Sequence, residues 1–193
     1  MFTGIIEATA RVRRKTGAGR SVLFVIEKPK RWNIIRGESV AVDGTCLTVK
    51  EVGKGNWVTE LMPETLGKTY FVKHMPNAVN LERPLKLSDR LGGHLLLGHI
   101  DATGTITRIT ARGSSKVYRI AFLKKFSRLV AEKGSVAVDG ISLTVVNASK
   151  GWFTVSLVDY TMKHTTLGRK KTGDWVNLEF DVIAKYLDAL VRK

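Results

Sequence analysis

Cysteine is almost absent from this sequence of 193 residues, in which Cys46 is the only one. A single cysteine cannot form a disulfide within its own chain. The four histidines have no cysteine partners at the spacing of a zinc finger. We therefore expect neither a disulfide framework nor a metal site.

Long apolar runs are also missing. No run approaches the roughly 18 residues that cross a bilayer. The opening residues, MFTGIIEATA, lack the charged region followed by an apolar stretch that is typical of a signal peptide. The sequence therefore predicts a cytoplasmic protein with no membrane partner.

Acidic residues are few, 17 against 32 lysines and arginines, so the net charge is +15. Such an excess favours a polyanionic partner such as RNA. However, both halves of the chain share the excess, and the densest clusters, RVRRK at Arg11, KPKR at Lys28 and RKK at Arg169, are short. They also lack the interleaved aromatic residues of a single-strand stacking platform. A solvated basic surface is the favoured interpretation, and nucleic acid is not an expected partner.

The sequence does contain a long internal repeat. GIIEATARV at residues 4–12 returns as GHIDATGTI at residues 98–106. SVAVDGTCLTV at residues 39–49 returns as SVAVDGISLTV at residues 135–145. A spacing of about a hundred residues is long enough for each copy to be a domain with its own core.

Two further blocks recur in the same order. ETLGKTYF from Glu64 parallels YTMKHTTLG from Tyr160, and VNLERPLKL from Val79 parallels VNLEFDVIA from Val176. The chain is therefore a tandem duplication. We expect an N-terminal domain over 1–92, a similar C-terminal domain over 93–180 and a terminal helix over 181–193.

Most of the remaining segments have the pattern of short strands. SVLFVIE, WVTELM, YRIAFL and WFTVSLV are rich in β-branched and aromatic residues, and turn residues such as GAGR, GKGN and RGSS separate the strands. This pattern favours a small antiparallel barrel or Greek-key sandwich in each half. Residues 126–134 have helical spacing and end in glycine, and 29–38 hold the same place in the first repeat. We expect a short helix there in each half.

The clearest helix is the C-terminal segment DVIAKYLDALVRK, for which Asp181 is a candidate N-cap. Its apolar residues form one stripe, which consists of Ile183, Tyr186, Leu187, Leu190 and Val191. An apolar stripe needs a partner. Either the helix docks on its own domain, or copies from several chains cover one another.

Seven motifs occur in the order typical of one enzyme family: MFTGIIE, the two DGxxLTV segments, LMPETL, GGHLLLGHID, TTLG and VNLEFDVIAKY. Together they cover nearly all of the chain, which closely resembles the riboflavin synthase alpha-chain family. The resemblance implies an all-β fold of two tandem six-stranded antiparallel Greek-key barrels with a C-terminal helix. It also implies a homotrimer held together by these helices.

The activity that the resemblance implies is a dismutation without a cofactor. One 6,7-dimethyl-8-ribityllumazine donates a four-carbon unit to a second, giving riboflavin and 5-amino-6-(ribitylamino)uracil in the last step of riboflavin biosynthesis. Two similar pockets suit a reaction between two identical molecules, because holding the reactants face to face can lower the barrier by roughly 7 to 11 kcal/mol.

The ligand is a flat, amide-rich ring with a polyol chain, so its pocket needs backbone groups and short polar side chains. The repeated motifs supply these groups, and we expect Gly4–Ile6 to join Cys46–Thr48 in the first pocket and Gly98–Ile100 to join Ser142–Thr144 in the second. The full set that the motifs and the resemblance indicate is Gly4, Ile5, Ile6, Ser39, Cys46, Leu47, Thr48, Glu60, Leu61, Met62, Pro63, Glu64, Thr65, Gly98, His99, Ile100, Lys133, Ser142, Leu143, Thr144, Ser156, Leu157, Val158, Asp159, Tyr160 and Thr161.

If one copy donates and the other accepts, the two pockets must differ. His99 stands where the first repeat has Ile5, and Ser142 stands where it has Cys46. His99 can move protons near neutral pH, and Ser142, Thr144 or a water that they position can act at the electrophilic carbon.

The resemblance implies that the two substrates meet between the N-terminal domain of one subunit and the C-terminal domain of its neighbour. Cys46 and Ser142 then face each other across the ligand pair, and Asp181 and Lys133 help to bind or polarise. Two other histidines, His74 and His94, have no counterpart in the repeat and receive no role.

The chain departs from the family pattern at Leu97, where serine is common, and at Asp159 and Tyr160, where proline is commonly followed by histidine or glutamate. These departures affect the expected ribityl contacts of the second pocket. The alternative functions are a non-catalytic lumazine or flavin carrier and, from charge alone, an RNA-binding barrel protein.

Overall fold

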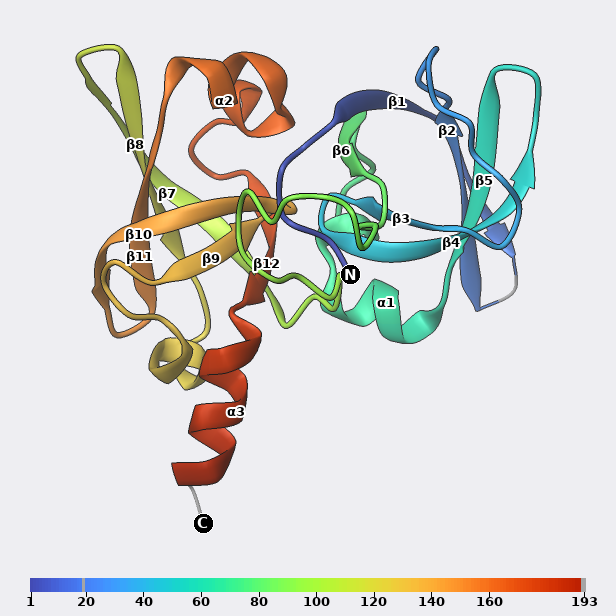
Figure 1. Ribbon diagram of the computed structural model, residues 1–193. Coiled ribbons are helices and arrows are strands. Elements are labelled where there is room, and N and C mark those ends of the chain that lie inside the picture. The colour runs from blue at the N-terminus through green and yellow to red at the C-terminus, as the bar shows by residue number, and fades with distance from the viewer. Residues whose placement is uncertain (19, 192–193) are drawn as a thin grey trace.

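The computed structural model describes residues 1–18 and 20–191. It contains two closed barrels side by side, with the N-terminal segment between them and a helix that projects from the second barrel (Figure 1). The expected turn GAGR includes Gly19, and the expected terminal helix segment includes residues 192–193; these positions lie outside the described residues. No helix in the described part of the chain is long and apolar enough to span a membrane.

The first barrel is antiparallel and closes in the order β1-β2-β5-β4-β3-β6. Its strands are β1 (Ala8–Ala18), β2 (Ser21–Glu27), β3 (Ser39–Val42), β4 (Thr45–Val52), β5 (Asn56–Leu61) and β6 (Ala78–Glu82). Between β5 and β6 lie the short helix α1 (Pro63–Lys68) and the 3₁₀ helix η1 (Tyr70–Val72). Each of these strands therefore has a hydrogen-bonded neighbour on both sides, which limits edge-to-edge association.

The second barrel repeats this topology, in the order β7-β8-β11-β10-β9-β12. Its strands are β7 (Ala102–Arg112), β8 (Ser115–Ala121), β9 (Ser135–Val138), β10 (Ile141–Ser149), β11 (Trp152–Leu157) and β12 (Trp175–Phe180). The other elements are η2 (Lys124–Leu129), α2 (Asp159–His164) and η3 (Thr166–Arg169). The predicted duplicated pair of six-stranded barrels is confirmed.

Alternation along the strands separates the inside of each barrel from its outside. In β5 the side chains of Trp57, Thr59 and Leu61 are buried, whereas the residues between them are only half-buried. In β11 Phe153 and Leu157 take the same inward positions. Each barrel therefore encloses its own apolar core.

The helical expectations were met only in part. Residues 126–134 contribute to the 3₁₀ helix η2, but residues 29–38 form no helix. In that segment Trp32 and Ile34 are buried and their neighbours are exposed, so the chain packs with a period of two between hydrogen-bonded turns at either end. The short helices α1 and α2, which were not predicted, are too short to produce a helical period.

The terminal helix α3 (Val182–Val191) begins as predicted. The Asp181 carboxylate accepts a hydrogen bond from the Ile183 N–H at 2.9 Å, which confirms Asp181 as the N-cap. Polar contacts tie the helix to the second barrel, through Lys185 to Asp101 at 2.9 Å and through Arg128 to Asp188 at 3.7 Å. The stripe of Ile183, Tyr186, Leu187, Leu190 and Val191 is 58 to 74 % exposed. The helix therefore does not cover its stripe on its own barrel.

The two barrels meet at their Asp-Gly turns, Asp43–Gly44 and Asp139–Gly140. Both glycines have φ of +78°, and a Cβ added to Gly44 would lie only 2.7 Å from the Gly140 nitrogen. Glycine is therefore required on both sides of this contact.

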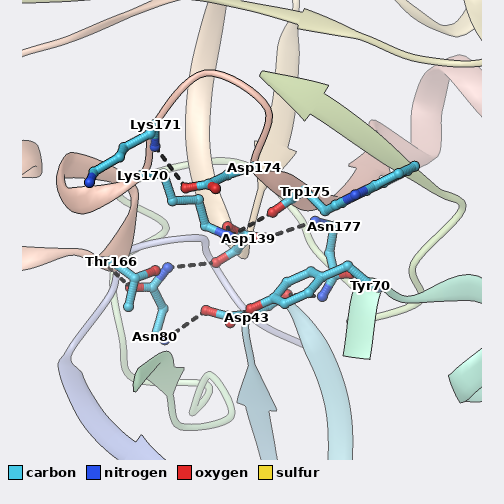
Figure 2. Close-up of polar contacts among 10 residues, drawn as sticks. All are labelled: Asp43, Tyr70, Asn80, Asp139, Thr166, Lys170, Lys171, Asp174, Trp175 and Asn177. Carbon is cyan, nitrogen blue, oxygen red and sulfur yellow. Dashed lines mark hydrogen bonds and ion pairs between the residues drawn. The ribbon is translucent and has the colours of Figure 1, made fainter. Parts of the chain in front are cut away.

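Two asparagines join the barrels reciprocally across this contact (Figure 2). The Asn80 amide donates to the Asp139 carbonyl at 3.0 Å and accepts from the Thr166 N–H at 2.8 Å. The Asn177 amide donates to the Asp43 carbonyl at 3.1 Å and accepts from the Tyr70 N–H at 2.9 Å. These bonds hold the two barrels in one relative orientation.

The two aspartates at this contact are fully buried and have different partners (Figure 2). Asp43 accepts from the Tyr70 hydroxyl at 2.5 Å, whereas Asp139 pairs with the Lys170 ammonium at 3.1 Å. Burial, together with the neighbouring Asp139, raises the pKa of Asp43 from 3.8 to about 8. Near neutral pH Asp43 therefore holds a proton in the folded state.

Asp43→Asn is expected to flatten the pH dependence of stability. The pKa of Asp43 is raised on folding. Its contribution to the free energy of unfolding is therefore present at low pH and is lost as pH rises toward 8. The loss amounts to about 1.4 kcal/mol per pH unit for one proton. Urea unfolding at pH 6 and pH 8 measures it. Asp89→Asn, at an exposed position, should keep the wild-type dependence, and an unchanged slope in Asp43→Asn would contradict the prediction.

Candidate functional site

The outer face of β4 carries the first group of predicted site residues. Cys46 and Thr48 point outward, whereas Leu47 and Val49 point into the barrel core. Ser39 of β3 lies directly opposite Thr48 in the sheet, and so on the same face. Beside these strands lies a groove of about 510 Å³, lined by Arg36, Gly37, Cys46, Leu47, Thr48, Val49, Lys50, Glu60, Met62 and Thr65. The fold therefore brings together six of the predicted binding residues.

Glu60 supplies a negative charge to this groove. Its carboxylate accepts hydrogen bonds from the Lys50 ammonium at 2.6 Å and from the Ser21 hydroxyl. The Lys50 bond in particular holds the pKa of Glu60 below its usual value. The carboxylate is therefore ionised and able to accept from ligand hydroxyls. Of its predicted neighbours, Leu61 lies in the core, and Pro63 and Glu64 are exposed at the start of α1.

The glycine segments cross between the barrels. The Gly98 carbonyl accepts from the Cys46 N–H at 2.8 Å, and the Gly4 carbonyl accepts from the Ser142 N–H at 2.9 Å. Ile6 packs against the core of the second barrel. The expected grouping of each segment with the β-strand of its own repeat is therefore wrong.

The physical reason is a short antiparallel pairing between the barrels. Phe2 exchanges backbone hydrogen bonds with Leu96, so residues before β1 run beside residues before β7. Each segment then reaches the other barrel. A Cβ on Gly98 would lie 2.5 Å from the Cys46 Cβ, so the approach requires glycine. The repeated sequence cannot show that each glycine segment bonds to the barrel of the other repeat. The two copies are so similar that either glycine segment is compatible with either barrel.

Ser142 has a partner that the sequence did not indicate. Its hydroxyl lies 2.7 Å from His94 Nδ1, and His94 is only 9 % exposed. Burial lowers the pKa of His94, and the charge of Asp181 opposes this shift. A neutral imidazole can accept the hydroxyl proton, which is the arrangement of an activated nucleophile. Within the described part of the chain His94 Nε2 is buried without a hydrogen-bond partner.

His94 was missed because it has no counterpart in the first repeat. The available signal was the Gly92-Gly93 pair that precedes it. A Cβ on Gly93 would lie 2.1 Å from the Thr3 carbonyl oxygen and 2.8 Å from the Ser142 Cβ. Only glycine allows the backbone to pass so close to Ser142 and deliver His94 to it.

His99 lies with the first barrel and not with Ser142. It follows Gly98, whose carbonyl is bonded to Cys46. Its side chain is exposed and has no hydrogen bond or ion pair with any described residue. The pairing of His99 with Ser142 and Thr144 that the sequence suggested is therefore not observed.

The remaining predicted residues of the second pocket are more dispersed. Thr144 is exposed two positions after Ser142, on the same face of β10, and Leu143 and Ile100 are half-buried. Lys133 has a left-handed backbone with φ of 65°, donates its N–H to the Val145 carbonyl and exposes its side chain.

The predicted residues around α2 lie mostly on the surface. Leu157 lies in the core, Ser156 and Val158 are exposed, and Thr161 is half-buried. Asp159 pairs with Lys163 at 2.7 Å, and the Tyr160 ring stacks on His164 with centroids 4.0 Å apart. Asp159 and Tyr160, two of the three departures from the family pattern, therefore interact with their own helix.

A larger hollow, of about 800 Å³, lies on another face and contains none of the predicted site residues. It gathers the basic clusters, with Arg11, Lys28 and Arg169 in its lining. The lining as described includes no aromatic side chain, so it offers no stacking platform for single-stranded RNA. Among residues 1–18 and 20–191 no cluster of three or more potential metal ligands occurs.

Comparison with known proteins shows where such an arrangement occurs elsewhere. A family model described as the lumazine binding domain matches residues 3–84 and again residues 97–181. A protein named riboflavin synthase from Mycobacterium bovis is 41 % identical over 198 residues, covering 100 % of this chain and 98 % of its own. Its namesake from Actinobacillus pleuropneumoniae is 40 % identical, with 100 % and 91 % covered, and that from Bacillus subtilis is 35 % identical, with the same coverage.

Solved structures share the fold. A crystal structure of LumP complexed with riboflavin has a TM-score of 0.87 at 21 % identity, covering 93 % of this chain and 99 % of that chain. LumP complexed with 6,7-dimethyl-8-(1'-D-ribityl) lumazine has a TM-score of 0.84 at 22 % identity, covering 93 % and 98 %. The double barrel is thus a known architecture.

Proposed function

The chain belongs to the riboflavin synthase family, and on that premise we propose that each of its barrels binds one 6,7-dimethyl-8-ribityllumazine. It is an enzyme of the riboflavin synthase type, which converts two lumazines into riboflavin and 5-amino-6-(ribitylamino)uracil. The four carbons that one lumazine loses are the four that riboflavin gains, so the reaction needs no redox partner. The division into 1–92, 93–180 and 181–193, and a cytoplasmic location, remain predictions.

The first pocket in this proposal is the groove on the first barrel. Cys46 and Thr48 line it beside the backbone of Gly98, which comes from the other half of the chain. Backbone amides and carbonyls suit the flat, amide-rich ring. The ionised Glu60, paired with Lys50, suits the ribityl hydroxyls.

The second pocket contains the chemistry, and the bond of 2.7 Å between Ser142 and His94 is the observation that carries the proposal. The neutral imidazole accepts the hydroxyl proton, and the oxygen of Ser142, or of a water held there, adds to C7 of the acceptor lumazine while the π-electron pair at C7 moves into the ring. The first barrel has Cys46 at the equivalent position. This difference assigns unequal roles to the two bound lumazines.

Self-association completes the proposed site. The exposed stripe of α3 provides an apolar surface for copies of the helix in a homotrimer. In the arrangement that the family resemblance implies, the first pocket of one subunit then faces the second pocket of its neighbour, so that the two lumazines meet. Their relative orientation then supplies much of the rate enhancement.

One anaerobic assay tests the proposed function. Purified protein is mixed with 6,7-dimethyl-8-ribityllumazine and followed by absorbance. We expect riboflavin to accumulate at half the molar amount of lumazine consumed. Tight binding without turnover would overturn the proposal in favour of a carrier, and the absence of both binding and turnover would refute it as well.

A further inference from the structure

Two buried glutamates hold the crossing segments. Glu82, the last residue of β6, is 4 % exposed. Its carboxylate accepts from the Thr3 N–H at 2.6 Å, from the Thr3 hydroxyl at 2.7 Å and from the Gly4 N–H at 3.1 Å. The backbone before β1 is thus bound to the end of the first barrel.

Glu179 occupies the equivalent position in β12 and is 2 % exposed. One oxygen accepts from the Leu97 N–H at 2.8 Å and the other from the Gly98 N–H at 3.0 Å. The two glutamates occupy the same position, the fourth, in the two copies of the VNLE motif. Each accepts hydrogen bonds from two consecutive backbone N–H groups.

Each anchored segment continues to the opposite barrel. Glu82 in the first barrel holds Gly4, and the Gly4 carbonyl accepts from the Ser142 N–H of the second barrel at 2.9 Å. Glu179 in the second barrel holds Gly98, and the Gly98 carbonyl accepts from the Cys46 N–H of the first barrel at 2.8 Å. The hydrogen bonds therefore run from each glutamate to the outer face of the other barrel.

We propose that Glu82 and Glu179 are positioning residues with crossed action: Glu179 orders the first pocket through Gly98, and Glu82 orders the second pocket through Gly4. The assignment of the two faces as lumazine pockets rests on the proposed function, whereas the crossed control of Cys46 and Ser142 rests on geometry alone.

The cost of burying these carboxylates supports a specific role. Burial raises the pKa of both, and that of Glu179 to about 7, in spite of Lys185 and the two N–H bonds. An apolar residue would pack in the same place without this penalty. It would leave two adjacent backbone N–H groups without an acceptor, and the segment would have no fixed path to the other barrel.

The only cysteine of the chain reports on the first pocket directly. Cys46 is partly exposed, and its rate of reaction with a maleimide measures how well Gly98 covers it. In Glu179→Gln, which has one carbonyl oxygen for two N–H groups, we expect this rate to rise about tenfold through local opening. In Glu82→Gln we expect it to stay within about twofold.

The reverse experiment uses a Cys46→Ser, Ser142→Cys background, in which the reporter lies on the second barrel. Here Glu82→Gln should accelerate labelling and Glu179→Gln should not. Glu7→Gln is the matched control in both backgrounds, because the Glu7 carboxylate also accepts from a backbone N–H, that of Arg83, whereas the N–H groups of Gly4 and Gly98 bond to Glu82 and Glu179.

The crossed pattern separates positioning from general destabilisation. Equal acceleration of both reporters by both variants would overturn the proposal, and so would no acceleration. If Glu179→Gln does not fold, Gly98→Ala, whose Cβ would clash with Cys46, must accelerate labelling of Cys46 and leave the reporter at position 142 unchanged. Labelling needs no substrate, so failure here is distinct from failure of the turnover assay.

Discussion

Replacing Ser142 by alanine is expected to lower kcat by about 100-fold or more, the usual contribution of a positioned acid-base group. The substitution removes the hydroxyl that lies 2.7 Å from His94 Nδ1, while the Ser142 N–H bond to Gly4 is a backbone contact and persists. Lumazine binding should therefore change by less than about threefold. Riboflavin formation at saturating substrate and equilibrium fluorescence titration measure the two quantities.

The hydrogen bond between Ser142 and His94 predicts that the effects of their substitutions on kcat are strongly non-additive. His94→Gln should cost about as much as Ser142→Ala, and the double variant should be no slower than either, because two residues that act as a unit lose their effect together. Ser115→Ala is the control: this hydroxyl bonds the Arg112 carbonyl in the β7–β8 hairpin, far from the site in sequence, and should not change kcat. Independent, multiplying effects of the two site variants would contradict the proposed pairing.

Placing charge on the α3 stripe is expected to have the second large effect. The double variant Leu187→Asp, Leu190→Asp puts two carboxylates on side chains that are 58 % and 65 % exposed in the single chain. If copies of this helix bury one another, the variant dissociates and kcat falls by about 100-fold, because two subunits no longer bring their lumazines together. Light scattering during size-exclusion chromatography reports the mass, and the turnover assay reports the activity.

The matched control places a carboxylate on the same helix but outside the stripe. Ala189→Asp changes an exposed position of α3 and should leave both mass and activity unchanged. A wild-type protein that is already monomeric and fully active would refute the self-association, as would an active monomer of the double variant. The activity of the dissociated variant should also recover partly at high protein concentration, by mass action.

The elements that were predicted correctly have local or repeated signals. The alternating apolar residues in β5 and β11 and the capped helix at Asp181 each depend on neighbours in sequence. The duplication then predicts that both halves share one topology. The segment 29–38 was misread because the burial of Trp32 and Ile34, which decides its shape, depends on the barrel beneath it.

The candidate site was predicted less completely. The residues of β4 and β5 that meet at the groove were found, because they belong to one barrel and to repeated motifs. His94 was not predicted. Its role depends on its contact with Ser142 of the second barrel, which the close approach of the Gly93 backbone allows. The partner of each glycine segment was wrong for the same kind of reason, since long-range contacts leave no period in the sequence.

The sequence by itself determined the family, the two barrels, the six predicted residues that meet at the groove of the first barrel, and a terminal helix with an apolar stripe. These depend on periodicity, turn chemistry and repeated motifs, all of which are local along the chain. Only the tertiary structure decided that Gly4 bonds to Ser142 and that Gly98 bonds to Cys46. It also decided that Glu82 and Glu179 hold these glycines in place. The reason is physical. The pairing of Phe2 with Leu96 directs the segment before each barrel to the other barrel. The buried backbone N–H groups of these segments then need acceptors, and the glutamate carboxylates provide them.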